Sequence, residues 1–307
     1  MLFLRYSAVS IIGLLIVLGL SGCGGEESTT KLPIFDGQRA FSLLEKQVSL
    51  GPRNPNSPGW QAMQEWLKDF TDSIGVDVRV QKFDYLDYLT GDTLHLVNWI
   101  IPINPERKNR ILIGGHYDCR PRAEHDPDPD LRERPILGAN DGASSTAVIL
   151  HLAELMIDQP PFAGVDLILF DGEDYGPPGR LDQYLIGSSH FAQTNKTEYR
   201  FGILLDMIGD KDLRIYRESS SQLHAGDVND LVWETAARQN ATAFIDSIKY
   251  TVMDDHIPLI AAGIPTVDLI DFDYPVWHTQ ADTPDKCSAA SLETVGLVVL
   301  EVIYNER

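Results

Sequence analysis

The sequence contains few cysteines and few basic residues, and these shortages exclude several classes of protein. Three cysteines among 307 residues, none in a Cys-x-x-Cys pair, are too few for a scaffold held together by disulfides. The 25 Lys and Arg residues face 45 Asp and Glu residues, so the formal net charge is −20 at pH 7. A chain this acidic repels phosphate backbones, and we expect no nucleic-acid partner. Hydrophobic residues at 43% and charged residues at 23% are typical of a globular chain, not of a collagen-like, disordered or multi-span membrane protein.

Common catalytic motifs are also absent. The chain has no Gly-x-Ser-x-Gly elbow, no phosphate-binding Gly-x₄-Gly-Lys loop, no Gly-x-Gly-x-x-Gly after a strand and no His-Glu-x-x-His helix. Ser188 and His190 are close in sequence, but catalytic triads are assembled in space, so we expect both to be structural. The alternating Asp and Pro residues at 126–130 lack the glycine and distal glutamate of an EF-hand loop. Four further histidines have no motif around them and are expected to be structural or solvated: His95, His125, His151 and His224.

The first 22 residues have the pattern of a secretory signal. Arg5 precedes an apolar run at residues 8–20, and a membrane-spanning helix needs roughly 20 such residues. The run is followed by Leu20-Ser21-Gly22-Cys23, which is typical of bacterial lipoproteins that are cleaved before the cysteine and acylated on it. The alternative is a signal anchor that happens to end in cysteine. We therefore expect a lipoprotein signal peptide at residues 1–22, with Cys23 as the lipidated residue.

The remaining sequence predicts a lipid-anchored enzyme of the bacterial cell envelope. Residues 23–34 are small and polar enough for a flexible tether, and residues 35–307 contain no second linker or repeat, so we expect one catalytic domain there. Gly24 replaces the aspartate associated with retention at the inner membrane of Gram-negative cells. That favours the periplasmic face of the outer membrane or the cell surface. Whether Cys119 and Cys287 form a disulfide stays open, because sequence does not give their separation.

The hydrophobic pattern predicts an α/β fold of three layers, with a mixed but mostly parallel central sheet flanked by helices. Residues 38–50 and 60–73 have helical periodicity. Residues 111–115, 165–170, 201–205 and 265–270 are nearly continuous apolar runs, as expected of strands buried on both faces.

Acidic residues and histidines follow these strands, where ligand sites of open α/β sheets gather. Each has a plainer explanation on its own: Asp141 could cap a helix, residues 173–174 could form a solvated turn, and His278 could be a surface histidine. Together they suit zinc, whose catalytic sites use carboxylates and imidazoles. Glu173, beside a candidate ligand, is placed to act as a general base. The five candidate ligands are His116, Asp141, Asp174, Asp206 and His278.

At these residues the chain resembles the zinc aminopeptidase superfamily, and more narrowly its glutaminyl cyclase branch. The resemblance extends from residue 51 to the C-terminal helix. The segments that carry it are Gly115-His116-Tyr117-Asp118, Gly138-Ala139-Asn140-Asp141-Gly142, Phe170-Asp171-Gly172-Glu173-Asp174, Leu204-Leu205-Asp206-Met207-Ile208-Gly209, Asp254-Asp255-His256-Ile257-Pro258 and Val276-Trp277-His278-Thr279. The resemblance implies one zinc, held by Asp141, Asp174 and His278, in a cyclase. In an aminopeptidase it implies two, with Asp141 bridging and His116 and Asp206 added.

Two positions favour the cyclase branch. Aminopeptidases usually have Ser-Asp-His where this chain has Asp254-Asp255-His256, and Trp277 matches the tryptophan that walls the cyclase pocket. Tyr274 stands where cyclases place another aromatic residue, although both aromatic residues could simply pack at loop bases. Differences from the animal cyclases affect the pocket wall more than the reaction. Asp174 is glutamate in those enzymes, residues 175–179 lack their pocket tryptophan, and Asp268 replaces a histidine.

The resemblance implies that the enzyme cyclises the N-terminal glutamine of a peptide or protein to pyroglutamate. N-terminal glutamate would be a further substrate. Glu173 would carry the proton from the amine to the leaving nitrogen, while Asp254 and Asp206 bind along that route. Trp277 and Tyr274 would hold the substrate. The runner-up is a two-zinc aminopeptidase, and a third possibility is a non-catalytic envelope binding protein. The physiological substrate, the oligomeric state and the membrane leaflet are not determined by these residues.

Overall fold

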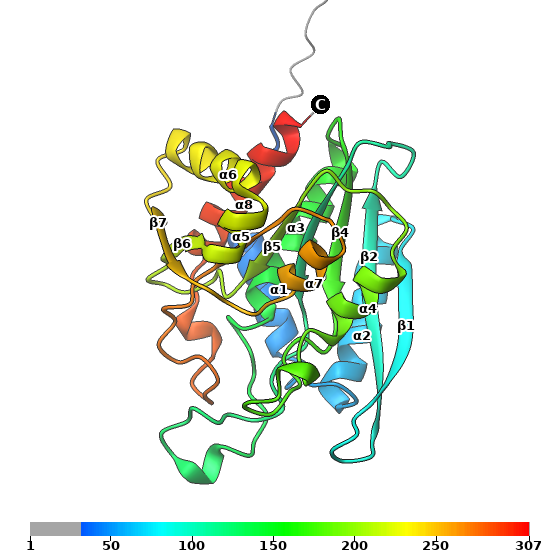
Figure 1. Ribbon diagram of the computed structural model, residues 1–307, viewed down its shortest axis with the longest axis vertical. Coiled ribbons are helices and arrows are strands. Elements are labelled where there is room, and N and C mark those ends of the chain that lie inside the picture. Colours follow the sequence, from blue (N-terminus) through cyan, green and yellow to red (C-terminus); the bar gives the residue numbers. More distant parts are fainter. Residues whose placement is uncertain (1–31, 307) are drawn as a thin grey trace, which may run out of the picture. The chain divides into compact units, whose positions relative to one another are not determined.

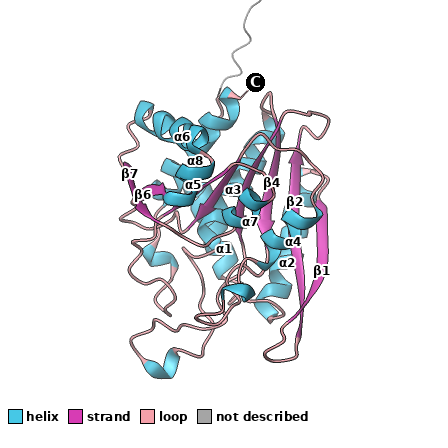
Figure 2. Ribbon diagram, viewed as in Figure 1, coloured by secondary structure: helices cyan, strands magenta, loops and turns pink. Residues whose placement is uncertain are grey.

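The computed structural model describes residues 32–306, and its centre is a six-stranded sheet with helices on both faces (Figures 1 and 2). The expected signal peptide, Cys23 and most of the tether lie outside the described residues. The strand order is β1-β2-β4-β3-β5-β8. β3 pairs in parallel with β4 and β5, and β5 with β8, whereas β1–β2 and β2–β4 are antiparallel. The strands are β1 (Arg79–Leu86), β2 (Thr93–Ile103), β3 (Arg110–His116), β4 (Gly164–Phe170), β5 (Gly202–Asp206) and β8 (Thr266–Ile270).

The alternation of side chains along the central strands buries both faces of the sheet. Ile111 and Ile113 belong to the main core, which they share with helices α1 (Gly37–Val48), α3 (Ala143–Asp158) and α8 (Ala289–Asn305). Leu112 belongs to a second core on the other face, with residues of α4 (Ile186–Thr194) and α7 (His256–Ala261). The three-layer fold expected from the apolar runs is confirmed, and the four expected strands correspond to β3, β4, β5 and β8.

Local signals explain where the first helices begin and end. Asp36 caps α1 by accepting hydrogen bonds from the backbone of Gln38 and Arg39. α2 (Pro58–Ile74) starts behind Ser57, which accepts from the backbone of Trp60, and ends at Gly75 with φ of 71°. The two predicted helices are therefore present, with boundaries shifted by one or two residues.

The remaining elements lie beside β8. β6 (Ile215–Glu218) and β7 (Phe244–Tyr250) form a small parallel sheet, accompanied by α5 (Ser219–His224) and α6 (Gly226–Arg238). Residues 32–306 pack as one compact unit. Within that range no helix has both the length and the apolar character needed to cross a membrane.

Candidate metal centre and active site

All five predicted ligands meet at the carboxyl ends of the central strands. His116 ends β3 and Asp206 ends β5, while Asp174 lies in the loop after β4 and His278 in the loop after β8. Asp141 lies just before α3 and completes the group. Parallel strands place their carboxyl ends at one edge of the sheet, which is why residues so far apart in sequence converge there.

The two oxygens of Asp141 face two different groups of ligands. His116 Nε2 lies 3.2 Å from Asp141 Oδ1 and 3.2 Å from Asp206 Oδ1. On the other side, His278 Nε2 lies 3.6 Å from Asp141 Oδ2 and 3.5 Å from Asp174 Oδ1. In each group of three the candidate ligand atoms lie within 4.8 Å of one another. Asp141 is thus placed either to complete one metal site or to bridge two.

The backbone around the ligands is held in unusual conformations. Gly142 has φ of 96°, and a Cβ there would lie 2.3 Å from the carbonyl oxygen of Asp118, so only glycine allows this turn. His278 has φ of 56°, and Met207, directly after Asp206, has φ of 46°. Non-glycine residues in this region cost free energy and persist where the surrounding structure holds them, often at functional sites.

Glu124 and Arg120 orient the ligands, and neither was among the residues that the sequence analysis selected. Glu124 Oε1 lies 3.1 Å from His278 Nδ1. A hydrogen bond from Nδ1–H to this carboxylate would leave Nε2 as the nitrogen that binds a metal. Arg120 is fully buried, donates to Glu124 Oε2 at 2.7 Å and also bonds to Asp174. A carboxylate next to a candidate His ligand is the usual support for a metal-binding imidazole, but sequence does not show that these two residues meet.

Each candidate ligand shifts the pKa values of its neighbours. Burial and the charge of Asp174 raise the pKa of Asp141 to about 7. Burial also works to raise the pKa of Asp174, but the charges of His278 and Arg120 outweigh it and leave that pKa below its ordinary value. For His278, burial is outweighed by Asp174 and Glu124, and its pKa rises to about 9. A divalent cation would neutralise this concentration of buried carboxylates.

Glu173 faces the same cavity as the candidate ligands. Burial raises its pKa well above the ordinary value, and the charge of Asp174 adds to the rise. Asp118 accepts the backbone N–H groups of Glu173 and Asp174, at 3.1 and 3.3 Å, and so holds this turn. Asp254 and Asp206 line the cavity as well. The pKa of Asp254 is also raised well above its ordinary value, by burial and by Asp206.

The cavity has a volume of about 270 Å³, and both acidic and apolar side chains line it. The acidic side chains are Glu124, Asp141, Glu173, Asp174, Asp206 and Asp254. The apolar side chains include Trp277, Phe272 and Met253. His125, expected to be structural or solvated, does not line the cavity, but its ring lies 4.8 Å from that of Trp277. Trp277 was predicted from the sequence as a substrate-binding residue, whereas Phe272 and His125 were not.

Tyr274, which the resemblance predicts to hold the substrate, is a buried residue. Tyr274 is 4% exposed, does not line the cavity and packs with Met207, Val252 and Ile270. Its hydroxyl donates to Asp282 at 2.7 Å. Asp282 in turn accepts the backbone N–H of Asn140 and Asp141, so Tyr274 supports the ligand loop from behind.

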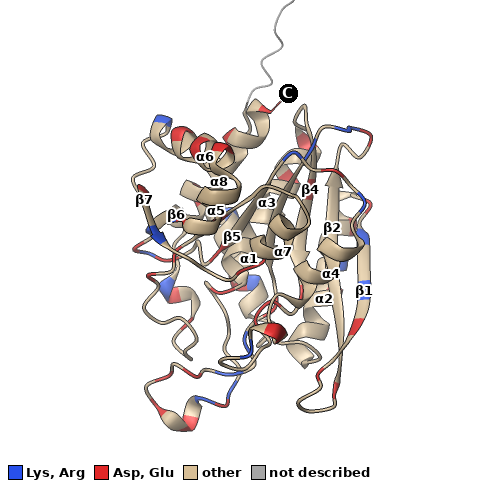
Figure 3. Ribbon diagram, in the orientation of Figure 1, with Lys and Arg blue, Asp and Glu red and all other residues tan. Residues whose placement is uncertain are grey.

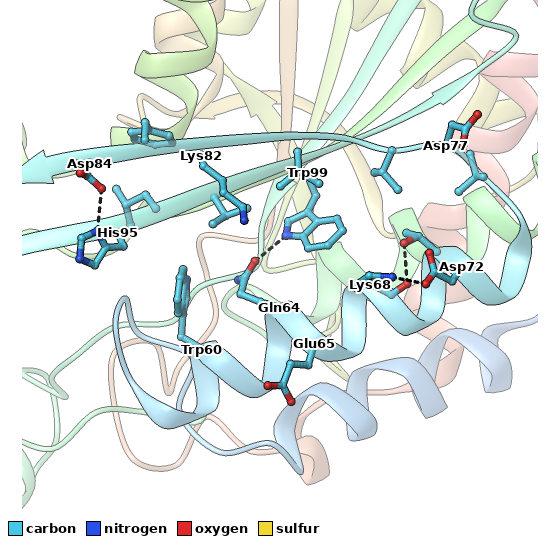
Figure 4. A pocket seen from close by; sticks show the side chains of 17 residues that line it. Trp60, Gln64, Glu65, Lys68, Asp72, Asp77, Lys82, Asp84, His95 and Trp99 are labelled. Carbon is cyan, nitrogen blue, oxygen red and sulfur yellow. Dashed lines mark hydrogen bonds and ion pairs between the residues drawn. The ribbon is translucent and has the colours of Figure 1, made fainter.

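A larger cavity, of about 750 Å³, lies between α2 and the β1–β2 hairpin (Figure 4). Figure 4 shows Gln64 accepting a hydrogen bond from Trp99, and Lys68 paired with Asp72 on the same helix. Its charged side chains are of both signs, and none of the described clusters with metal-ligand spacing lies there. We therefore assign the chemistry to the smaller acidic cavity.

The structure answers two further questions that the sequence raised and leaves a third outside the described residues. Cys119 and Cys287 are both buried and free, so they form no disulfide. Ser188 donates to Asp255, whereas His190 stacks on Phe83 at 3.9 Å, and the two make no catalytic pair. Lipidation of Cys23 concerns a residue outside the described part of the chain and stays a prediction.

The residues present fit a metal ion. Two buried oxygens at the centre of the cluster, Asp141 Oδ2 and Asp174 Oδ2, have no hydrogen-bond partner. Buried carboxylate oxygens without a partner are costly, and a cation at this position would satisfy both. Two carboxylates and one imidazole match the donor types and number that a catalytic zinc takes from protein.

Comparison with known proteins identifies a matching family and several similar enzymes. Residues 98–303 match peptidase family M28. Among curated proteins, the glutaminyl-peptide cyclotransferase of Boiga dendrophila is 25% identical over 284 residues, covering 80% of this chain and 75% of that protein.

Two solved structures from Bacteroides thetaiotaomicron are similar over nearly the whole described chain. One is a glutaminyl cyclase bound to N-acetylhistamine, 36% identical with a TM-score of 0.87, covering 90% of this chain and 100% of that one. The other is a leucine aminopeptidase precursor, 36% identical with a TM-score of 0.88, covering 91% of this chain and 100% of that one. The fold is therefore shared by proteins named for both reactions.

Proposed function

The chain belongs to peptidase family M28, and we propose that within this family it is a zinc-dependent glutaminyl cyclase that converts N-terminal glutamine of peptides or proteins to pyroglutamate. The observation that carries the proposal is Asp254, a buried carboxylate that lines the cavity together with Glu173 and Asp206. Cyclisation transfers a proton between two nitrogen atoms of one substrate residue. A wall with several carboxylates supports such a transfer without an attacking water.

The reaction balances within the substrate. The α-amine nitrogen bonds to the side-chain carbonyl carbon, the bond from that carbon to the amide nitrogen breaks, and ammonia leaves. Glu173 accepts the proton that the amine loses and delivers it to the leaving nitrogen. Its raised pKa suits a group that must be protonated and deprotonated in one turnover.

Zinc held by Asp141, Asp174 and His278 would polarise the amide carbonyl and stabilise the negative charge that develops on its oxygen. Asp254 and Asp206 accept hydrogen bonds from the amine and from the departing ammonia. Trp277 lines a cavity of about 270 Å³, and so small a volume limits the conformations of the glutamine side chain. Holding that chain in a bent pose lowers the entropic cost of ring closure.

The decisive experiment incubates the zinc-loaded protein with a Gln-initiated and a Leu-initiated dipeptide and identifies products by mass. We expect the Gln peptide to lose the mass of ammonia and the Leu peptide to stay intact. Release of free leucine, with two zinc ions bound per chain, would overturn the proposal.

A two-metal aminopeptidase is the second candidate, and one observation favours it. His116, Asp141 and Asp206 place their ligand atoms within 4.8 Å of one another, as a second metal would require. Replacing Asp254 by Ser separates the candidates. The cyclase loses its proton-route carboxylate and most of its rate, whereas an aminopeptidase keeps a residue usual in its own branch.

We also propose that Cys23 carries a lipid and that the enzyme is held at the cell envelope. The support is the Leu20-Ser21-Gly22-Cys23 pattern after a short apolar run. Its partners are then Gln-initiated peptides or proteins of that compartment, with the membrane contacted through the anchor.

A further inference from the structure

The larger cavity, between α2 and the β1–β2 hairpin, has no part in the proposed reaction. We call it the hairpin cavity, and it shares no lining residue with the acidic cavity. Its volume of about 750 Å³ lies within the range of about 300–1,000 Å³ that is typical of sites for small molecules. Trp60 and Trp99, both buried, line it together with apolar side chains of the hairpin. These side chains offer a small molecule a large apolar and aromatic contact area.

The register of the hairpin places one lysine within this apolar lining. Lys82 of β1 lies opposite Val97 of β2, and the neighbouring pair on the same face is Val80 with Trp99. In Figure 4 the Lys82 side chain extends from β1 toward α2, and no hydrogen bond or ion pair joins it to another described residue drawn there. Lys82 therefore offers an unpaired positive charge to a molecule in the cavity.

The carboxylates of the lining are either paired or turned away. Asp72 is paired with Lys68 on α2. Asp84 Oδ1 lies 2.7 Å from His95 Nδ1 on the neighbouring strand. Figure 4 shows the other two pointing away from the space between the helix and the hairpin, namely Glu65 and Asp77. Among the described residues, the unpaired charge that points into the hairpin cavity is thus positive, and the complementary ligand group is a carboxylate.

Two residues of the hairpin cavity hold the start of the turn that carries Glu173. The indole N–H of Trp60 donates to Asp171 Oδ2 at 2.9 Å, and the backbone N–H of Val97 donates to the same oxygen at 2.8 Å. Asp171 directly follows β4, is fully buried and stands two positions before Glu173. A displacement of the Trp60 ring therefore acts on the turn that positions the proposed proton carrier.

We propose that the hairpin cavity binds a small carboxylate with a planar apolar body, and that its occupancy alters the turn around Glu173 through Trp60 and Asp171. The carboxylate pairs with Lys82, while the apolar body lies against Trp60 and Trp99. The binding site stands independently of the proposed function, whereas its effect on catalysis rests on that function. A ligand there regulates the enzyme to the extent that it binds two arrangements of the turn with different affinity.

The binding test measures, by calorimetry on the zinc-loaded protein, the affinities of naphthylacetate and of its uncharged amide, naphthylacetamide. We expect the carboxylate to bind about three- to tenfold more tightly than the amide. Lys82→Met should abolish this preference, because it removes the ammonium group and keeps an apolar stem. Lys108→Met is the matched control and should keep the preference, because Lys108 is exposed and lines neither cavity.

Two results of this test would overturn the proposal. One is the absence of binding by either compound. The other is a preference for the carboxylate that persists in Lys82→Met, since the probe would then bind elsewhere, such as on the metal.

The kinetic test measures whether the ligand acts on the catalytic turn. At saturating naphthylacetate we expect kcat for a Gln-initiated dipeptide to change at least about twofold in the wild-type protein. The change should disappear in Trp60→Phe, which keeps an aromatic ring but lacks the N–H that Asp171 accepts. Trp66→Phe, on the same helix but outside the cavity lining, is the control and should respond as the wild type does.

An unchanged kcat in the wild type would overturn the link to catalysis. A rise in KM alone would also overturn it, because that result means competition at the acidic cavity. If no peptide is cyclised at all, the proposed function fails, whereas calorimetry still decides whether the hairpin cavity binds the carboxylate.

Discussion

At the scale of single residues, the chemistry of the site depends on side chains that touch the candidate ligands from outside. His278 is held by Glu124, and Glu124 by the buried Arg120. The same arrangement occurs elsewhere in the molecule without a metal role, where Glu154 bonds to His151 and Arg39. Glu124 and Glu154 are similarly buried, and each pairs with one histidine and one arginine. Comparing substitutions at the two positions therefore distinguishes an effect on metal binding from an effect on stability.

Glu124→Gln is expected to weaken zinc binding by about 10–100-fold, because the carboxylate that orients and strengthens the His278 imidazole is lost. Competition with a chelator measures the change. Glu154→Gln is the control and should leave the zinc affinity unaltered. An equal loss in both variants would mean that Glu124 acts only through stability.

Glu173→Gln is expected to lower kcat by about 10²–10⁴-fold while the zinc content stays the same, because an amide cannot carry the proton between the two nitrogens. Ammonia release and metal analysis on the same sample provide the measurement. A variant that retains full turnover would remove Glu173 as the proton carrier.

At the scale of elements, the turn between β1 and β2 fixes a loop that belongs to the active site. Asp87 in this turn is 3% exposed and accepts hydrogen bonds from Tyr175 at 2.8 Å and from Gln183 at 2.7 Å. The loop between these two residues carries Leu181 to the cavity mouth, and the adjacent Tyr184 lines the wall. The hairpin therefore helps to position part of the cavity lining, although none of its own residues line the cavity.

Asp87→Asn is expected to lower the free energy of unfolding by about 1–3 kcal/mol and to raise KM more than it lowers kcat. Burial works to raise the pKa of Asp87, but hydrogen bonds from Leu89, Tyr175, Gln183 and Thr90 outweigh it and lower the pKa to about 2. An unfolded aspartate has a pKa of about 3.9.

Because the folded-state pKa is the lower one, the stabilisation by Asp87 is complete above about pH 4 and is lost as the pH falls toward 2. The Asn variant should lack this part of the acid dependence in denaturation curves. Asp92→Asn, an exposed change in the same turn, is the control and should behave as wild type. An unchanged acid limb in Asp87→Asn would contradict the assignment.

At the scale of the whole molecule, the start of the described chain and the candidate site lie at opposite ends of the central sheet. Figure 1 shows the described chain beginning beside the C-terminal end of α8, whereas the loops that follow β3, β4 and β5 lie at the other end of the sheet. Acidic segments occur among those loops, as Figure 3 shows.

Cys23→Ala is expected to abolish lipid labelling and leave an unprocessed precursor, because acylation of the cysteine precedes cleavage. Metabolic labelling with a fatty acid, followed by fractionation, measures both effects. Cys287→Ala keeps Cys23 and should remain labelled, since Cys287 is a buried free thiol within the folded unit. Continued labelling of Cys23→Ala would refute the lipoprotein proposal.

The central strands were predictable because of their burial. β3 and β4 are parallel strands covered on both faces, so nearly every residue in them is apolar, and a polar residue stands out where the strand ends. His116 and Asp174 were found in this way. β1 is an edge strand with alternating exposure, and β6 has four residues, so neither has a comparable pattern.

The sequence by itself determined the layered fold and the chemical types of the ligands, because both follow from local features: apolar runs, and the residues directly after them. Only the tertiary structure decided that Glu124 supports His278, 154 positions away, and that Phe272 rather than Tyr274 faces the cavity. Such pairings depend on the path of long loops and on the direction in which each side chain points. Neither leaves a periodic trace in the sequence, since each is set by packing against elements distant along the chain.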